Sequence, residues 1–283
     1  MADLAPRVNI NLAGAWRFAL DGEDVGVKEE WFGHDLQQVI NLPGALQSQG
    51  YGDEISTETP WVLSLYDRFW YLREDYKAYT NAGSVKVPFL SQPPKHYLGA
   101  AWYQRDVEIP EDWKDKHITL TLERPHWETT VWIDERKVGT NNSLVAPHVY
   151  DLGALAPGLH RITIRIDNRL IMPYRPDAHS VSDSLAGSWN GIVGKIELTA
   201  TSPIWIDDVQ VFPNVEKKTV VVKVKIGNMT GENGEGTLRV IGGVAPAIVP
   251  LKWDAGGAQT ELEVQLNPGT QTWDEFHPRR QPL

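Results

Sequence analysis

The stretch Ser182–Leu198, SDSLAGSWNGIVGKIEL, runs from a polar loop into a strand. From Ile192 onward every second residue is apolar or glycine, which is the pattern of a strand with one buried face. The Asn190-Gly191 step just before this strand is enough to make a tight turn. The carboxylate of Asp183 and the indole of Trp189 are more than a turn needs. The loop is therefore a candidate for a function besides chain reversal.

The same alternation of apolar and polar residues recurs along most of the chain. Short alternating or β-branched segments, separated by clusters of Pro, Gly, Asn and Asp, are typical of antiparallel sandwiches and barrels. The segments expected as strands are Ala15–Leu20, Ala101–Ile109, His117–Leu122, Thr129–Asp134, Arg161–Asp167, Ile192–Ala200, Val209–Phe212 and Thr219–Ile226. Only Glu74–Tyr79 and Glu111–Lys114 indicate short helical turns. The sequence therefore predicts an all-β fold.

A change of composition near Thr201–Pro203 divides the chain into two predicted domains, residues 1–200 and residues 201–283. The second part has fewer aromatic residues and more glycine. It is also shorter than a complete small sandwich, which has about 100 residues.

The composition excludes several classes of protein. The net charge is −10 and no run of Lys and Arg occurs, which argues against a nucleic-acid partner. No apolar stretch approaches the length of a membrane span, so we expect no membrane partner. The absence of cysteine excludes disulfides, thiol catalysis and Cys-zinc sites. His126 and Glu128 lack a third metal ligand at suitable spacing, so we expect neither a metal nor a cofactor.

The first residues, MADLAPRVNINLAG, show no basic end followed by an apolar core, so no signal peptide is visible. The sequence leaves the compartment open between a secreted or periplasmic protein and a cytoplasmic bacterial one.

Aromatic residues are unusually frequent. The chain has twelve tryptophans, a usage typical both of sandwich cores and of proteins that stack on sugar rings. Many aromatic side chains fall in Leu46–Gly99, which is too long for an ordinary connection. Disordered segments are poor in aromatic residues. We therefore expect this segment to be ordered and to pack with the first sandwich.

Four stretches in this order resemble one known family. They are LAGAWRF (Leu12–Phe18), GAAWYQRDVEIPEDW (Gly99–Trp113), VWIDERKVGTNNSL (Val131–Leu144) and SWNGIVGKIEL (Ser188–Leu198). Together they resemble the N-terminal sugar-binding domain of glycoside hydrolase family 2, the β-galactosidase and β-glucuronidase group. Two positions depart from the family pattern: Glu135 stands in place of a Gly, and Gly194 stands in place of an Arg.

The resemblance implies a galactose-binding-like jelly-roll sandwich, followed by a smaller and incomplete immunoglobulin-like sandwich. It also implies retaining catalysis by two Glu on a (β/α)8 barrel. Such a barrel needs about 250 residues, for which this chain has no room. We therefore expect the carbohydrate-recognition and scaffold portion of a β-galactosidase-like glycosidase, with catalytic residues unknown. The ligand that the resemblance implies is a β-galactoside or a β-glucuronide.

The resemblance further implies that loops of the first domain reach a sugar site. Asp183 matches a family Asp before the last strand, and the loop before Trp102 places His96 and Tyr97 in the region of a second family residue. The sugar-binding candidates are Asp183, Trp189, Asn190, His179, His96 and Tyr97. Each has a structural alternative: a turn acid, a core Trp, a turn Asn or a structural ring.

Two other functions are compatible with the sequence. One is a self-sufficient β-glycosidase whose carboxylates lie on the sandwich loops; the pairs to consider join Asp177 or Asp183 with Glu54, Glu58, Glu74 or Asp75. One carboxyl of such a pair needs a raised pKa to act as the acid. The other is an assembly module with no sugar site.

The C-terminal stretch Thr272–Leu283, TWDEFHPRRQPL, matches the family's closing pattern only at Trp273 and Pro278. The adjacent arginines and Pro282 cannot form the alternating strand that closes the family's domain. We therefore expect an open sheet edge in residues 201–283, which lowers their stability or recruits another chain into an oligomer.

Overall fold

The structure is a computed structural model, and it describes residues 7–81, 83–87, 94–172, 175, 182–184 and 188–280. The chain forms two compact units. The larger consists of Arg7–Lys114 and Ile118–Ala200, and the smaller contains Asp115–His117 and the described residues from Thr201 onward. The fold is all-β, as predicted, with short 3-10 helices between strands. In the described part of the chain, no helix has the length and apolar character that a membrane span requires.

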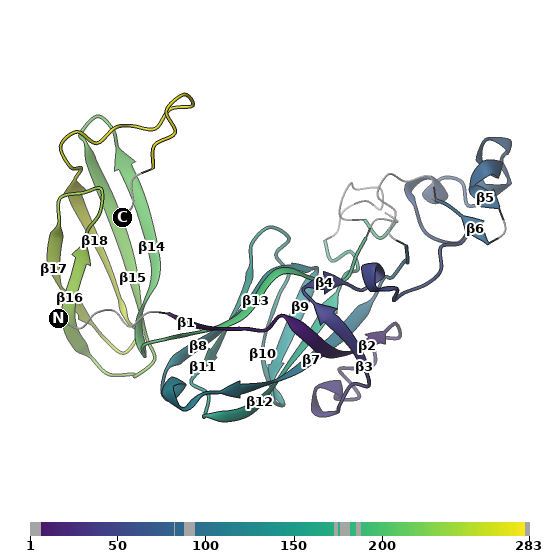
Figure 1. Cartoon of the computed structure of the whole chain (residues 1–283), viewed down its shortest axis with the longest axis horizontal. Coiled ribbons are helices and arrows are strands. Elements are labelled where there is room, and N and C mark those ends of the chain that lie inside the picture. The colour runs from purple at the N-terminus through teal and green to yellow at the C-terminus, as the bar shows by residue number, and fades with distance from the viewer. Residues whose placement is uncertain are drawn as a thin grey trace. The chain divides into compact units, whose positions relative to one another are not determined.

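The larger unit contains a six-stranded antiparallel sheet (Figure 1). In sheet order its strands are β10 (Arg136–Asn141), β9 (Glu128–Ile133), β12 (Gly158–Asp167), β7 (Ala100–Ile109), β2 (Gly14–Asp21) and β3 (Gln38–Leu42). The second sheet has the order β1-β13-β8-β11, with β4 also paired to β13. Its strands are β1 (Val8–Asn11), β13 (Gly191–Thr201), β8 (His117–His126), β11 (His148–Gly153) and β4 (Gly44–Ala45).

The two sheets enclose one core. Alternate residues of β12, namely Ile162, Ile164 and Ile166, are fully buried, and so are Leu120 and Leu122 of β8. This is the alternation by which the strands were predicted, because one face of each strand turns to the core. The helical turn η6 (Glu111–Trp113), also predicted, adds the buried Trp113 to this core.

A second apolar layer covers the outer face of the six-stranded sheet. The segment between β2 and β3, which includes η1 (Trp31–Gly33), places Trp31 and Phe32 over Trp102 and Trp132. Trp102 and Trp132 stack with ring centroids 5.1 Å apart, and Phe32 stacks on Trp132 at 5.4 Å. The start of β7 is therefore buried on both faces.

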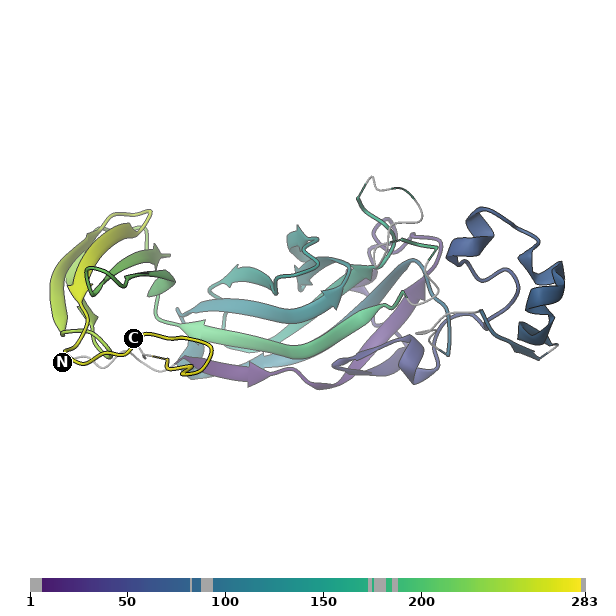
Figure 2. The same ribbon diagram turned by 90° about the horizontal axis from the view of Figure 1, so that it is seen from above.

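The segment between β4 and β7 is ordered over its described residues and has a small core of its own. Figure 2 shows the short helices of residues 62–79, in blue, gathered as one group. Its elements are η2 (Gln47–Gln49), η3 (Val62–Leu65), η4 (Trp70–Leu72), η5 (Glu74–Tyr79), β5 (Thr80–Asn81) and β6 (Ser84–Val85). The buried residues of its core are Trp61, Trp70 and Val87. We call residues 55–87 the insertion.

The aromatic residues of the insertion are not all buried. Tyr66 is 71% exposed, Phe69 60% and Tyr79 40%. The small core has room for a few rings only, so the others lie on its surface. The ends of the longer segment pack on the main sandwich instead: the ring of Tyr51 meets that of Phe18 with centroids 4.5 Å apart.

The smaller unit consists of a three-stranded sheet, β14-β15-β18, and a two-stranded sheet, β16-β17. Their bounds are β14 (Ile204–Asn214), β15 (Thr219–Asn228), β16 (Gly234–Val240), β17 (Ala247–Trp253) and β18 (Ala258–Gln265). The buried core residues are all Val, Ile or Leu. The edge strand β14 is exposed from Asp207 to its end.

Candidate functional site

Asn168 joins the two loops that the sequence predicts around a sugar site. It directly follows β12, and its Oδ1 accepts a hydrogen bond from the backbone N–H of Gly99 (2.9 Å). Its Nδ2 donates to the carbonyl oxygens of Tyr97 (2.8 Å) and Trp189 (3.2 Å). The loop before β7 and the loop before β13 therefore lie at the same end of the sandwich.

Asn190 lies at the centre of this junction and is completely buried. Its Oδ1 accepts from the hydroxyl of Tyr103 (2.8 Å), and its Nδ2 donates to the carbonyl oxygens of Ile166 (3.0 Å) and Gly99 (3.2 Å). Its backbone N–H donates to Oε1 of Gln47 (3.1 Å). No side-chain atom is left for a ligand, so in this structure Asn190 holds the loops in place rather than facing a sugar.

Gly191 allows β4 and β13 to approach closely. Its φ is +145°, and a Cβ at this position would lie 2.2 Å from the carbonyl oxygen of Gly44. Only glycine accepts this conformation and this contact without strain. The Asn-Gly step is therefore a packing junction at the beginning of β13 rather than the tight turn of a hairpin.

Tyr97 is also held inside the sandwich. Its hydroxyl accepts from the backbone N–H of Asp21 (3.2 Å) and donates to the carbonyl oxygen of Ala100. Burial raises the pKa of the Tyr97 phenol to about 12. The ring belongs to the main core, so the phenol fixes the loop that carries His96.

His96 and Asp183 bring charge and hydrogen-bonding capacity to this end of the sandwich. Oδ1 of Asp183 accepts from the backbone N–H of Leu170 at 2.6 Å. His96 is 6% exposed, and its Nε2 has no hydrogen-bond partner among the described residues. Burial lowers the pKa of His96, although the carboxylates of Asp53 and Asp183 oppose this shift. A neutral imidazole therefore lies within electrostatic range of the Asp183 carboxylate.

Trp189 is the outer ring of a three-ring stack. It is half-buried and lies on the ring of His126, with centroids 4.9 Å apart and an interplanar angle of 22°. Nδ1 of His126 lies 2.6 Å from the carbonyl oxygen of Trp189, to which it donates. Trp127 follows at 6.3 Å from His126 and is buried. The stack fixes the plane of the Trp189 indole.

An ion-pair network adjoins the same corner. The run Asp167-Asn168-Arg169, at the end of a predicted strand, indicates a structural hydrogen-bond corner, but it does not indicate the partners Asp24 and Arg165. Arg165 donates to Asp24 (2.6 Å) and Asp167 (2.9 Å), and Arg169 donates to Asp24 (2.7 Å) and Asp167 (2.9 Å). Burial opposes ionisation of both carboxylates, but the arginine hydrogen bonds outweigh it and lower the pKa of each. The alternation of Arg165, Asp167 and Arg169, at the end of β12 and just after it, was a visible signal for part of this network. Asp24 is too distant in sequence to be recognised.

The remaining predicted residues are in different situations. His179 and Asp177 lie outside the described residues. Glu54 pairs with Lys95, and Glu58 is exposed. Glu74 pairs with Lys77 (2.5 Å), and Asp75 lies 3.9 Å from Arg73. Within the described ranges, no group of three or more His, Asp or Glu is arranged to hold a metal ion.

Among the described residues, none of the carboxylates with a shifted pKa has the raised pKa of a general acid. The carboxylates whose pKa is shifted are Asp24, Asp106, Asp167 and Asp207, and each pKa is lowered. A general acid at neutral pH needs a raised pKa instead. What this end of the sandwich offers is the half-buried ring of Trp189 and the partly exposed carboxylate of Asp183.

Comparisons with known proteins agree with the expected resemblance. The chain is similar to a β-glucuronidase of Paenibacillus borealis, with 21% identity over 233 residues that cover 76% of this chain and 33% of the relative. It therefore spans about a third of the length of that relative. No family model matches the chain.

Solved structures give the same result for the fold. A calcium-binding mutant of Bacteroides uniformis β-glucuronidase 2 matches with a TM-score of 0.65 and 17% identity, covering 98% of this chain and 30% of the other. A Ruminococcus gnavus β-glucuronidase in complex with D-glucaro-d-lactam matches with a TM-score of 0.64 and 15% identity, covering 98% of this chain and 42% of the other. The resemblance to glycoside hydrolase family 2 is confirmed, and the relatives are β-glucuronidases.

Proposed function

We propose that this chain is the carbohydrate-recognition and scaffold portion of a family 2 β-glycosidase of the β-glucuronidase type. The observation that carries the proposal is the corner at which Asn168 joins the loops before β7 and β13. Trp189 and Asp183 lie at this corner. They are the two described sugar-binding candidates whose side chains are not fully buried in the core.

Each side chain has a role that follows from its contacts. One face of the Trp189 ring is occupied by His126, and the other face is assigned to the C–H groups of a pyranose. One carboxylate oxygen of Asp183 accepts the Leu170 N–H, and the second is assigned to sugar hydroxyls. His96 is not assigned a contact, because its Nε2 is buried as well as unpartnered among the described residues. Asn190 and Tyr97 support these groups without touching the sugar.

The comparisons support a uronide over a galactoside as the ligand, because the named relatives are β-glucuronidases. Two solved structures of Ruminococcus gnavus β-glucuronidase are complexes with D-glucaro 1,5-lactone and with D-glucaro-d-lactam. We assign recognition to this chain.

The test is saturation-transfer NMR of the purified chain with methyl β-D-glucuronide and methyl β-D-galactoside. We expect transfer to the glucuronide, and about tenfold weaker binding in Asp183→Ala, since a hydrogen bond to a charged group contributes about 1.5–3 kcal/mol. Asp112→Ala is the matched control, because Asp112 is an exposed acid on η6. Binding that is equal in both variants would contradict the assigned site.

A parallel assay distinguishes the other functions. Chromogenic β-glucuronides and β-galactosides are incubated with the same proteins, and we expect no turnover. Turnover that Asp183→Ala abolishes would establish a self-sufficient glycosidase instead. Absence of both binding and turnover would favour an assembly module.

A further inference from the structure

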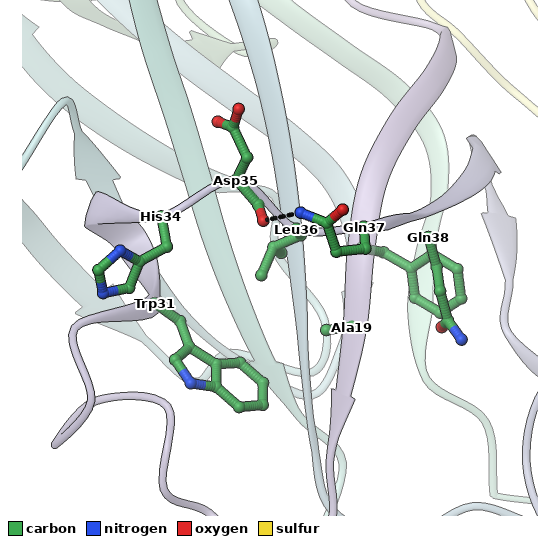
Figure 3. Close-up of a pocket in the computed structure, with 8 residues that line it drawn as sticks. Ala19, Trp31, His34, Asp35, Leu36, Gln37 and Gln38 are labelled. Atoms are coloured by element: carbon green, nitrogen blue, oxygen red, sulfur yellow. Dashed lines mark hydrogen bonds between the residues drawn. The ribbon is translucent and has the colours of Figure 1, made fainter.

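A pocket of about 260 Å³ lies on the outer side of the six-stranded sheet, where the segment between β2 and β3 folds over the sheet. In Figure 3, Trp31 and Leu36 come from this segment, Ala19 from β2 and Gln38 from the beginning of β3. None of these residues belongs to the corner at Asn168. The small side chain of Ala19 leaves the space that a larger residue would fill.

The wall of this pocket is fixed before any ligand arrives. Gln104 of β7 is completely buried, and its Nε2 donates to the carbonyl oxygens of Trp31 (2.9 Å) and His34 (2.8 Å). Its Oε1 accepts from the backbone N–H of Leu36 (3.1 Å). The Trp31 ring rests against Trp102 with centroids 6.0 Å apart. A prearranged wall avoids the entropy cost of ordering a loop on binding.

The chemistry of the pocket has two parts. The half-buried ring of Trp31, with Ala19 and Leu36, forms an apolar surface. The rim is polar: His34 and Gln38 are exposed, and their side chains have no hydrogen-bond partner among the described residues. Nε2 of Gln37 donates a hydrogen bond to the carbonyl oxygen of Asp35 (2.8 Å), which fixes the orientation of the Gln37 amide (Figure 3). Oε1 of Gln37 can therefore accept a hydrogen bond from a ligand.

We propose that this pocket binds a neutral pyranose, as a sugar site separate from the one at the Asn168 corner. A pyranose has an apolar C–H face for the Trp31 ring and a ring of hydroxyls for the amides and the imidazole. The volume is below the range of about 300–1,000 Å³ typical of drug-sized ligands, which limits the occupant to about one sugar ring.

The charges around the pocket favour a neutral sugar over a uronate. The Asp35 carboxylate lies on the rim and pairs with Arg161, so the arginine is not free for a ligand carboxylate. Nε1 of Trp31 donates to Glu29 (3.0 Å), which adds a second negative group near the ring. A uronate here would meet like charge. At the Asn168 corner the uronide is proposed from the relatives and not from the charges, because Asp183 places a carboxylate there as well.

The experiment labels the protein with 5-fluorotryptophan and follows ¹⁹F resonances during titration with methyl β-D-glucoside, methyl β-D-galactoside and methyl β-D-glucuronide. Trp31→Phe and Trp189→Phe assign the two signals of interest among the twelve tryptophans. Trp273, which is 61% exposed, reports non-specific effects. We expect the Trp31 signal to shift and saturate with a neutral glycoside and to respond more weakly to the glucuronide.

Gln38→Ala tests the rim without touching the core, and about fivefold weaker binding is expected for the loss of one hydrogen bond. Unchanged binding in this variant would contradict the proposed rim. A response of Trp189 alone would overturn this proposal and leave the first one standing. A response of Trp31 alone would support the pocket as a sugar site and contradict the site at the Asn168 corner. Equal shifts at Trp31 and Trp273, or no shift at Trp31, would also overturn it.

Discussion

Asn190 holds three backbone segments together through one amide. It reaches the ends of β12 and of the loop before β7, while its own backbone binds the side chain of Gln47. The hydroxyl of Tyr103 completes the set. A residue of this kind is easily mistaken for a ligand contact in a sequence. In a sequence, an asparagine whose buried amide has all its hydrogen-bond partners cannot be distinguished from an asparagine that is exposed in a binding site. Both occur in loops of similar composition.

Asn190→Ala should destabilise the protein strongly. The substitution removes the partner of the buried Tyr103 hydroxyl and one donor each from the carbonyl oxygens of Ile166 and Gly99, although Gly99 keeps the Asn168 N–H (3.4 Å). We expect a cost of about 3 kcal/mol in the free energy of unfolding. Urea denaturation followed by circular dichroism measures this. Asn142→Ala is the control, because that side chain is exposed and its loss should cost less than about 0.5 kcal/mol. A similar loss in both variants would show that Asn190 does not have this structural role.

His126 makes the stack at the Trp189 loop sensitive to acid. Burial lowers its pKa from the ordinary 6.5, although the hydrogen bond to Trp189 opposes this shift. Such a histidine binds fewer protons folded than unfolded. The stability present above about pH 6.5 is therefore lost as the pH falls below that value. His96 and His148 shift in the same direction through burial.

His126→Phe should reduce this loss of stability on acidification. The Phe ring can still pack on Trp189, and the Trp189 carbonyl still accepts from Nδ2 of Asn168 (3.2 Å). The measurement compares free energies of unfolding at pH 7.5 and pH 5 for the wild type, this variant and His277→Phe, whose histidine is exposed. An unchanged difference between the two pH values in His126→Phe would refute the assignment.

At the scale of elements, the segment between β2 and β3 shows what sequence patterns miss. The alternation in β7 correctly predicts the strand and its core-facing residues. The same pattern predicts that the other face of β7 is exposed to solvent. Trp102 and Gln104 on that face are nevertheless completely buried. The covering segment has no periodic pattern. Its position depends on contacts such as the hydrogen bonds from Gln104, which join residues about 70 positions apart.

The insertion, residues 55–87, is the element most able to unfold without the rest. Its buried residues belong to a cluster separate from the main core, in which Trp70 lies 5.0 Å from Trp61 and 5.6 Å from Tyr76 between ring centroids. Trp70→Ala should cost about 3–5 kcal/mol, which is more than a small cluster can tolerate. The sandwich should keep its thermal midpoint.

Limited proteolysis and thermal circular dichroism check this expectation. The wild-type insertion should resist cleavage, and Trp70→Ala should be cut within residues 55–87. Tyr66→Ala, at a ring that is 71% exposed, is the control and should behave like the wild type. A drop in the midpoint of the whole protein would mean that the insertion and the sandwich unfold as one.

For the whole molecule, the sequence predicted the fold class and the positions of the main strands, because period-2 alternation is a local property. The same is not true of the site. Asp183 and His96 are 87 positions apart; the family resemblance implies that both lie near one site, but only the fold shows that the Asp183 carboxylate acts on the pKa of His96. Asn190 and Trp189 are neighbours in sequence but have different roles. Asn190 is fully buried and holds the loops together, whereas Trp189 is half-buried and is proposed to contact a sugar. Pairing of the smaller unit with another chain through an open edge stays a prediction.

The division into domains near Thr201, which we propose, predicts two unfolding transitions. The smaller unit has an aliphatic core and a largely exposed edge strand, so it should melt first. Ile226→Ala in that unit and Ile164→Ala in the larger one are matched, since both side chains are at least 96% buried, as their exposures of 4% and 0% show. Each should cost about 2–5 kcal/mol. In scanning calorimetry, Ile226→Ala should lower only the first transition and Ile164→Ala only the second. If either substitution moved both transitions equally, the two units would form one cooperative structure and the proposed boundary would be wrong.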